Sequence, residues 1–207
     1  MLQFITVSPV RYSVAEQARM VIEGGCRWIQ ISSESADSSE TCMRKEAEGI
    51  IDLCTENEVF LVLENDVALV EDLKVHGVFL TDCSRESVAA ARERLGAHAV
   101  VGTRCRSYGD IEALKGLDVD YVSVPAEGPA AEFYAAMKRQ MTEAGIEFHL
   151  VAEGEFGTDE LAGLLAAGCA GVAMSTAIAE AGSPAVATRE VLDALDRGRE
   201  EAYRNRI

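Results

Sequence analysis

The chain has 207 residues, of which 48% are hydrophobic, 26% charged and only 6% aromatic. This composition is typical of a folded domain with a sizeable core, and it excludes a disordered or fibrous protein. Lys and Arg number 19 against 35 Asp and Glu, a net charge of −16, which argues against general binding to nucleic acid or to an anionic membrane surface.

Two further observations concern the compartment. No apolar run approaches the roughly 20 residues that cross a bilayer, and the first residues lack the basic and apolar regions of a secretory signal. The six cysteines form no C-x-x-C pair and have no histidines at metal-ligand spacing, so we expect reduced thiols. We therefore expect a cytoplasmic protein without a membrane partner.

Short apolar runs alternate with longer amphipathic stretches along the whole chain. Eight runs are predicted as strands: Gln3–Val7, Trp28–Ser32, Val59–Glu64, Gly77–Leu80, Val100–Arg104, Tyr121–Val124, Glu147–Glu153 and Gly171–Met174. Helical spacing of apolar residues predicts helices over Val14–Glu23, Ser84–Leu95, Asp110–Leu117, Pro129–Ala144 and Thr158–Ala167, and Asp193–Ile207 is predicted as a solvated helix end.

This alternation predicts a parallel sheet with right-handed crossovers. Eight strand–helix units in 207 residues fit a compact α/β fold, the (β/α)8 TIM barrel, as one domain over residues 1–207. An open doubly wound sheet is the alternative. The barrel is favoured because no G-x-G-x-x-G follows Val7.

In such a barrel the ligand site lies at the carboxyl ends of the strands. The candidate residues are therefore those that follow each apolar run. They are Ser8, Gln30 to Glu34, Glu64 to Asp66, Thr81 to Cys83, Arg104 to Ser107, Pro125 to Glu127, Glu153 to Glu155, and Ser175 with Thr176.

Several fragments at these positions have counterparts in one known family. They are Trp28-Ile-Gln-Ile, Asn65-Asp66, Gly77-Val-Phe-Leu, Val101-Gly102, Asp120-Tyr-Val and Leu165-Ala-Ala-Gly-Cys-Ala-Gly-Val-Ala-Met-Ser-Thr-Ala-Ile178. Over essentially its whole length the chain resembles the thiamine phosphate synthase family and its thiazole tautomerase relatives. The resemblance implies a phosphorylated small-molecule ligand, whose phosphate is held by backbone N–H groups at Gly154, Ser175 and Thr176.

The resemblance also implies an activity. The family joins a pyrimidine pyrophosphate to a thiazole phosphate and releases pyrophosphate, with Mg²⁺ offsetting charge on the leaving group. Gln30 matches the residue that contacts the pyrimidine. After strand three the family has Asn-Asp-Arg. With one deletion, Asn65 and Asp66 match the first two residues of this motif; without a gap, Glu64-Asn65-Asp66 aligns with all three positions. Asp66 and Asp82 are the implied metal ligands.

The departures from the family pattern concern charge. The family's Gln-x-Arg-Glu-Lys becomes Gln30 followed by Ile31, Ser32, Ser33 and Glu34, so two cations are missing. Its Gln-x-Asp becomes Asp82-Cys83-Ser84, and Glu155 stands where the family has its second glycine. We hypothesise that Arg104 and Arg106 restore the positive charge, since arginine grips phosphate oxygens bidentately.

The sequence is compatible with three functions. The first is a thiamine-phosphate-synthase-like transferase. The second is a non-catalytic barrel that binds a phosphorylated metabolite or a protein partner, which the lost cations favour. The third is a thiazole tautomerase, which in relatives uses a His after strand six, whereas Pro125–Ala131 contains none. The sequence also leaves open a homo-oligomer.

Overall fold

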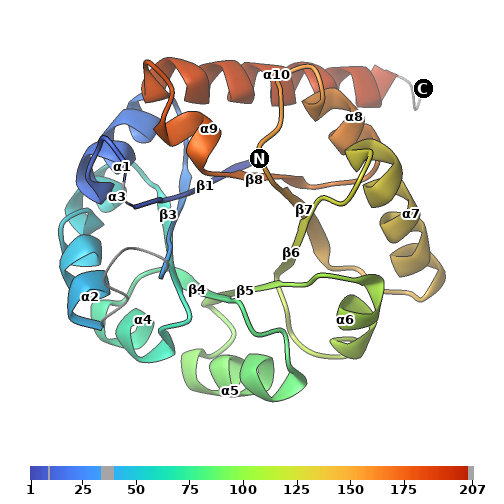
Figure 1. The fold of residues 1–207 in the computed structure, drawn as a ribbon. Helices are drawn as coiled ribbons and strands as arrows, with labels where there is room; N and C mark the ends of the chain where they lie inside the picture. Colours follow the sequence, from blue (N-terminus) through green and yellow to red (C-terminus); the bar gives the residue numbers. More distant parts are fainter. Residues whose placement is uncertain (9, 34–39, 205–207) are drawn as a thin grey trace.

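The computed structural model describes residues 1–8, 10–33 and 40–204. Eight parallel strands form a closed barrel in which each strand pairs with the next and β1 closes the ring with β8. Figure 1 shows this ring with the helices around its outside. The strands are β1 Leu2–Ile5, β2 Trp28–Ile31, β3 Phe60–Glu64, β4 Gly77–Leu80, β5 Val100–Arg104, β6 Tyr121–Pro125, β7 His149–Glu153 and β8 Gly171–Met174.

The structure confirms the TIM barrel, and the open sheet is wrong. All eight predicted strands are present, with differences at their ends: β1 stops at Ile5, and β7 begins at His149. The predicted and observed ends differ because the alternating pattern of apolar residues continues from the strand into the flanking loop residues.

The helices are α1 Val14–Glu23, α2 Glu40–Glu48, α3 Ile51–Glu56, α4 Val67–Leu73, α5 Arg85–Leu95, α6 Tyr108–Ala113, α7 Ala130–Glu143, α8 Leu161–Ala166, α9 Thr176–Ala179 and α10 Pro184–Arg204. Local signals start several of them. Ser13 and Ser107 each form a capping box with the acidic residue three positions later, which satisfies free N–H groups of α1 and α6. The predicted C-terminal helix end is the last part of α10 as far as Arg204.

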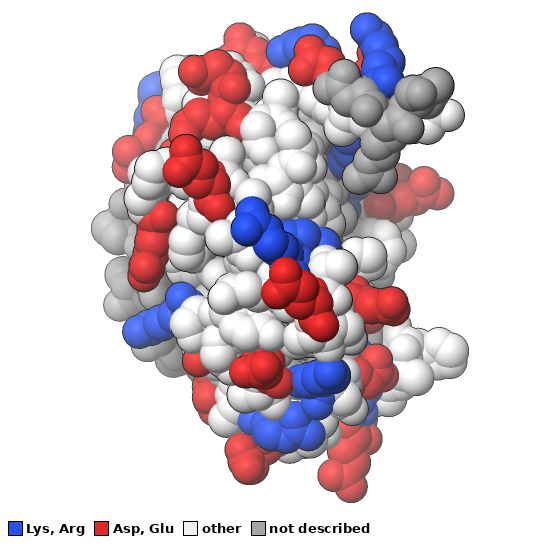
Figure 2. Space-filling model, turned by 90° about the vertical axis from the view of Figure 1, so that its right-hand side faces the viewer, with Lys and Arg blue, Asp and Glu red and all other residues white. Residues whose placement is uncertain are grey.

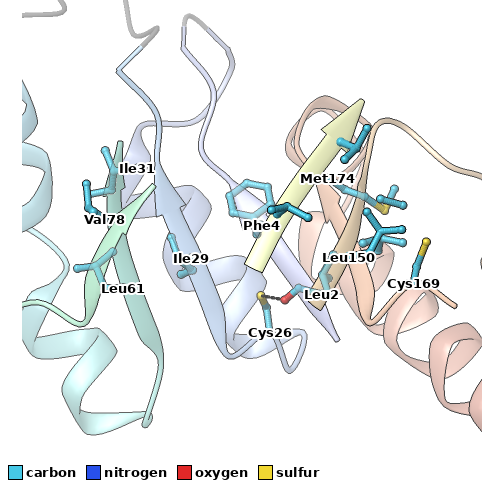
Figure 3. Packing of buried hydrophobic residues seen from close by; sticks show 14 of the residues in the cluster. Leu2, Phe4, Cys26, Ile29, Ile31, Leu61, Val78, Leu150, Cys169 and Met174 are labelled. Carbon is cyan, nitrogen blue, oxygen red and sulfur yellow. Dashed lines mark hydrogen bonds between the residues drawn. The ribbon is translucent and has the colours of Figure 1, made fainter. Parts of the chain in front are cut away.

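Two separate layers of apolar side chains stabilise the barrel. Alternate strand residues, such as Phe4, Ile29 and Leu150, point outward and pack in the cluster between the strands and the helices (Figure 3). The other strand positions point into the barrel, where a second, smaller cluster contains Ile5, Val62, Phe79, Tyr121, Val151 and Ala173. Buried Gln3, Gln30, Glu64 and Ser123 occupy inward positions of β1, β2, β3 and β6, so the barrel interior is partly polar.

The surface carries both signs of charge. On the face shown in Figure 2, Lys and Arg lie among Asp and Glu and form no continuous basic area. Within the described ranges, no helix is both long enough and apolar enough to cross a membrane.

Candidate functional site

A cavity of about 230 Å³ opens at the carboxyl ends of the strands. Because parallel strands of a barrel end at one rim, residues far apart in the chain meet here. The lining residues come from β1, β2, β5, β7 and β8 and the loops that follow them: Ile5, Thr6, Val7, Ser8, Ser32, Arg104, Glu153, Gly154, Glu155, Ala173 and Ser175.

The carboxylate of Glu155 lies at the start of α9. Its Oε1 accepts hydrogen bonds from the N–H of Ser175 at 3.2 Å, from the Ser175 hydroxyl at 2.8 Å and from the N–H of Thr176 at 2.9 Å. Its Oε2 accepts one from the N–H of Ala177 at 2.8 Å. The N–H of Gly154 donates to the carbonyl of Ala173. The groups expected to hold a phosphate are therefore bonded within the protein.

Arg104 is fixed in the cavity wall by Glu153. Arg104 Nη2 lies 2.9 Å from Glu153 Oε1, and Nε donates to Oε2 at 3.2 Å, so the ion pair is bidentate. The Ser123 hydroxyl donates to the same Oε2 at 2.7 Å, and the Arg104 guanidinium lies 5.5 Å from the Phe79 ring centre. Both charged side chains are less than one fifth exposed, so the positive charge of Arg104 is largely compensated.

Below this rim a chain of polar side chains crosses the barrel interior. Gln30, fully buried, donates to Glu64 Oε2 at 2.8 Å and accepts from Gln3 Nε2 at 2.9 Å. Gln3 also donates to the Tyr121 hydroxyl, and the Ser33 hydroxyl donates to Glu64 Oε1 at 2.7 Å. Burial raises the pKa of Tyr121 far above its ordinary value, so its hydroxyl stays protonated. Gln30 is thus bonded on both sides and does not line the cavity.

The residues that were expected to bind a metal ion instead accept hydrogen bonds that stabilise loops and the start of helices. Asp66 Oδ1 accepts from the N–H of Leu69 at the start of α4, and Asn65 Oδ1 accepts from the N–H and hydroxyl of Thr81. Asp82 accepts from Ser87 and Ser84, and these hydrogen bonds hold the pKa of its carboxyl below the ordinary value. Among the described residues, no group of three or more His, Cys, Asp or Glu is arranged to hold a metal ion.

A second cavity, of about 420 Å³, adjoins the first on the side of β5 and β6. Arg104, Arg106, Pro125, Glu127 and Glu153 line it. Arg106 is exposed, and its guanidinium has no hydrogen-bond or ion-pair partner within the described part of the chain. Of the two arginines at this rim, Arg106 is therefore the one whose charge is available to a ligand.

Comparison with known proteins identifies the family to which this barrel belongs. The model of the family described as "TMP-TENI: Thiamine monophosphate synthase" matches residues 2–178. The chain belongs to this family. The thiamine-phosphate synthase of Bacteroides fragilis is 31% identical over 206 residues, which cover 93% of this chain and 98% of that protein. The thiamine-phosphate synthase of Bacteroides thetaiotaomicron is 32% identical and covers 93% and 96%.

Solved structures agree on the fold of this thiamine monophosphate synthase family member. A thiamine phosphate pyrophosphorylase from Pyrococcus furiosus superposes with a TM-score of 0.80 at 19% identity, covering 95% of this chain and 96% of that one. One from Bacteroides thetaiotaomicron gives 0.66 at 16% identity, covering 94% and 97%. The match to the family model and the identity to the two Bacteroides synthases confirm the predicted resemblance.

The structure brings only some of the predicted site residues to the cavity. Arg104, Gly154 and Ser175 line it, Thr176 adjoins it through Glu155, and Arg106 faces the neighbouring cavity. Gln30 lies deeper in the barrel, whereas Asn65, Asp66 and Asp82 lie at the ends of β3 and β4 and are absent from the lining of both cavities.

Glu153 and Glu155 line the main cavity, although the sequence indicated no more specific role for them than that of residues at the end of a predicted strand. Alternation along β7 could have placed Glu153 on the inner face with Val151, at the level of Ala173 in β8.

The other reactive side chains lie elsewhere. The three histidines of the sequence, His76, His98 and His149, all lie before or at the start of a strand, at the end of the barrel opposite the cavity. Cys105 is buried and Cys83 half-buried, and burial raises the pKa of both thiols. A thiol that stays protonated is a poor nucleophile.

Proposed function

We propose that the protein is a transferase that joins hydroxymethylpyrimidine pyrophosphate to a thiazole. The observation that carries the proposal is the family relation, which extends over residues 2–178 and includes the rim of the barrel. In the reaction, a bond forms between the thiazole nitrogen and the pyrimidine methylene carbon. The bond from that carbon to the pyrophosphate oxygen breaks, and pyrophosphate leaves with the electron pair.

The two adjoining cavities suit two substrates. The thiazole would bind in the cavity between β1, β2, β7 and β8. The pyrophosphate would lie beside Arg106, whose guanidinium offers several N–H donors to phosphate oxygens. Arg104 would mainly form part of the cavity wall, because its ion pair with Glu153 holds the side chain in place and compensates its charge. Such a site works by positioning its substrates and by stabilising the charge on the leaving group.

Mg²⁺ is part of this proposal. Magnesium sites usually combine one or two carboxylates with substrate phosphates and water, so the lack of a three-residue cluster among the described residues is compatible with an ion that arrives with pyrophosphate. Asp66 and Asp82 would be its carboxylates, since each follows the end of one of two paired strands, β3 and β4. The ion would offset negative charge on the departing pyrophosphate.

The activity can be tested directly with purified protein. With hydroxymethylpyrimidine pyrophosphate, Mg²⁺ and either thiazole phosphate or the unphosphorylated thiazole alcohol, we expect pyrophosphate release and a coupled pyrimidine–thiazole product, both detected by chromatography with mass spectrometry. Chelation of Mg²⁺ should abolish the reaction. No product with either thiazole would reject the transferase.

The Arg106→Ala variant tests the pyrophosphate position. Loss of a charged hydrogen-bond donor should raise the KM for the pyrimidine pyrophosphate on the order of tenfold or more, while the KM for the thiazole stays the same. Arg139→Ala removes an equal charge from exposed α7 and should change neither constant. Equal KM values for the two variants would place the pyrophosphate elsewhere.

A second candidate is a barrel that binds a ligand without turnover. The ion pair of Arg104 and the bonded state of Ser175 and Thr176 favour it, because both remove groups that would otherwise hold phosphate. A thermal shift with a thiazole ligand and none with the pyrimidine pyrophosphate would support this function over the transferase. The tautomerase is disfavoured by the position of the three histidines.

Two further proposals concern the cellular compartment of the protein and the chemical class of its ligands. We propose a cytoplasmic protein, since all six cysteines are free thiols, as in a reducing compartment. We also propose that its ligands are small phosphorylated metabolites, with the pyrimidine pyrophosphate as the phosphorylated substrate.

A further inference from the structure

Glu155 makes the contacts that a bound anion would make. Three consecutive N–H groups, of Ser175, Thr176 and Ala177, and the Ser175 hydroxyl all donate to its carboxylate. Convergent backbone N–H groups of this kind bind the oxygens of phosphates and of carboxylates. A phosphate that enters this end of the cavity must therefore first displace the Glu155 side chain.

The charge of the cavity adds a second obstacle. Its ionisable lining residues are one cation, Arg104, and two carboxylates, Glu153 and Glu155. Arg104 is already in a bidentate ion pair with Glu153, so the charge of Glu155 has no cationic partner in the lining. A phosphate monoester carries about −1.5 to −2 charges at neutral pH, and it would be repelled at this short range.

The same carboxylate suits a different ligand group. Oε1 of Glu155 accepts three hydrogen bonds and Oε2 accepts only one. A carboxylate has about four acceptor positions on its two oxygens, so Oε2 can accept a hydrogen bond from a hydroxyl. Glu155 is exposed toward the mouth of the cavity, where a ligand hydroxyl can reach it.

We propose that Glu155 is a specificity-determining residue that makes the acceptor site select an uncharged thiazole alcohol instead of a thiazole phosphate ester. This inference rests on the proposed transferase function and names its acceptor. The ligand hydroxyl donates to Glu155 Oε2, the carboxylate replaces the missing phosphate, and the coupled product leaves without a phosphate group.

Steady-state kinetics with both acceptors test this inference. For the unmodified protein we expect kcat/KM to be at least about tenfold higher with the thiazole alcohol than with its phosphate ester. Glu155→Gly frees the four donors and removes the charge, so the preference should shift toward the ester by on the order of tenfold or more. Glu155→Gln, which removes only the charge, should give an intermediate ratio. Glu180→Gln removes a carboxylate just after α9 and should leave the ratio unchanged.

Binding measurements separate this inference from the proposed function. Calorimetric titration of the protein with each acceptor alone needs no turnover, and it should show tighter binding of the alcohol, with the order reversed in Glu155→Gly. Absence of product with retained alcohol selectivity would overturn the transferase and leave the selectivity of Glu155 standing. Tighter binding of the ester by the unmodified protein, or an equal ratio in all variants with unchanged thermal unfolding, would overturn the role of Glu155.

Discussion

Replacement of Gly77 by alanine is expected to destabilise the barrel by about 3 kcal/mol. Gly77 opens β4 and lies beside Val100 of β5, and a Cβ atom on it would lie 2.7 Å from the carbonyl carbon and 2.8 Å from the Cα of Val100. These are backbone atoms of a paired strand, so no side-chain rotation can relieve the overlap. The paired strands β4 and β5 would have to separate at this point of the ring.

Urea unfolding followed by circular dichroism measures this effect. Gly182→Ala is the matched control, because nothing lies within 4 Å of a Cβ added there, and we expect its free energy of unfolding to change by less than about 0.5 kcal/mol. Equal unfolding midpoints for the two variants would mean that β4 and β5 do not approach as closely as the structure has them.

Replacement of Gln30 by leucine is expected to cost about 3 kcal/mol of stability in the absence of any ligand. The amide of Gln30 connects Gln3 to Glu64 in the barrel interior, and each buried polar group left without a partner costs about 1–3 kcal/mol. The Glu64 carboxylate, only 2% exposed, would lose one of the two donors that the described residues provide. Thermal and urea unfolding of the ligand-free protein give the measurement.

This experiment also distinguishes two roles of Gln30. If the side chain served only to contact a ligand, the leucine variant would be as stable as the parent. Gln140→Leu provides the comparison, since Gln140 lies exposed on α7 and a surface change of this kind is usually within about 0.5 kcal/mol. A stability loss confined to Gln30→Leu is the result that the interior hydrogen bonds predict.

The fold could be predicted from the sequence, because strand and helix periods are local properties of the chain. Eight apolar runs with helical stretches between them indicate a parallel sheet, and the absence of G-x-G-x-x-G after Val7 favoured its closure into a barrel. The short helices α2, α3, α4 and α9 were not predicted. They have four to nine residues, and so few turns give only a weak periodic signal, although α6 and α8, with six residues each, were predicted.

The site could be predicted only as a region. The rule that ligands bind at the carboxyl ends of barrel strands correctly placed Arg104, Glu153, Gly154, Glu155 and Ser175 at one rim. It could not decide which of these residues bond to one another, because that depends on strand register and side-chain direction. Arg106 illustrates the difference, since only the structure separates it from the paired Arg104.

By itself, the sequence determined the barrel, the family and the presence of an unusual carboxylate at position 155. Only the tertiary structure decided what the charged groups do. Arg104 and Glu153 are 49 residues apart, and Glu155 lies 20 to 22 residues from the groups that donate to it. Such contacts form only when β7 lies between β6 and β8 in the folded sheet, and so the charge that remains available to a ligand is a property of the folded barrel.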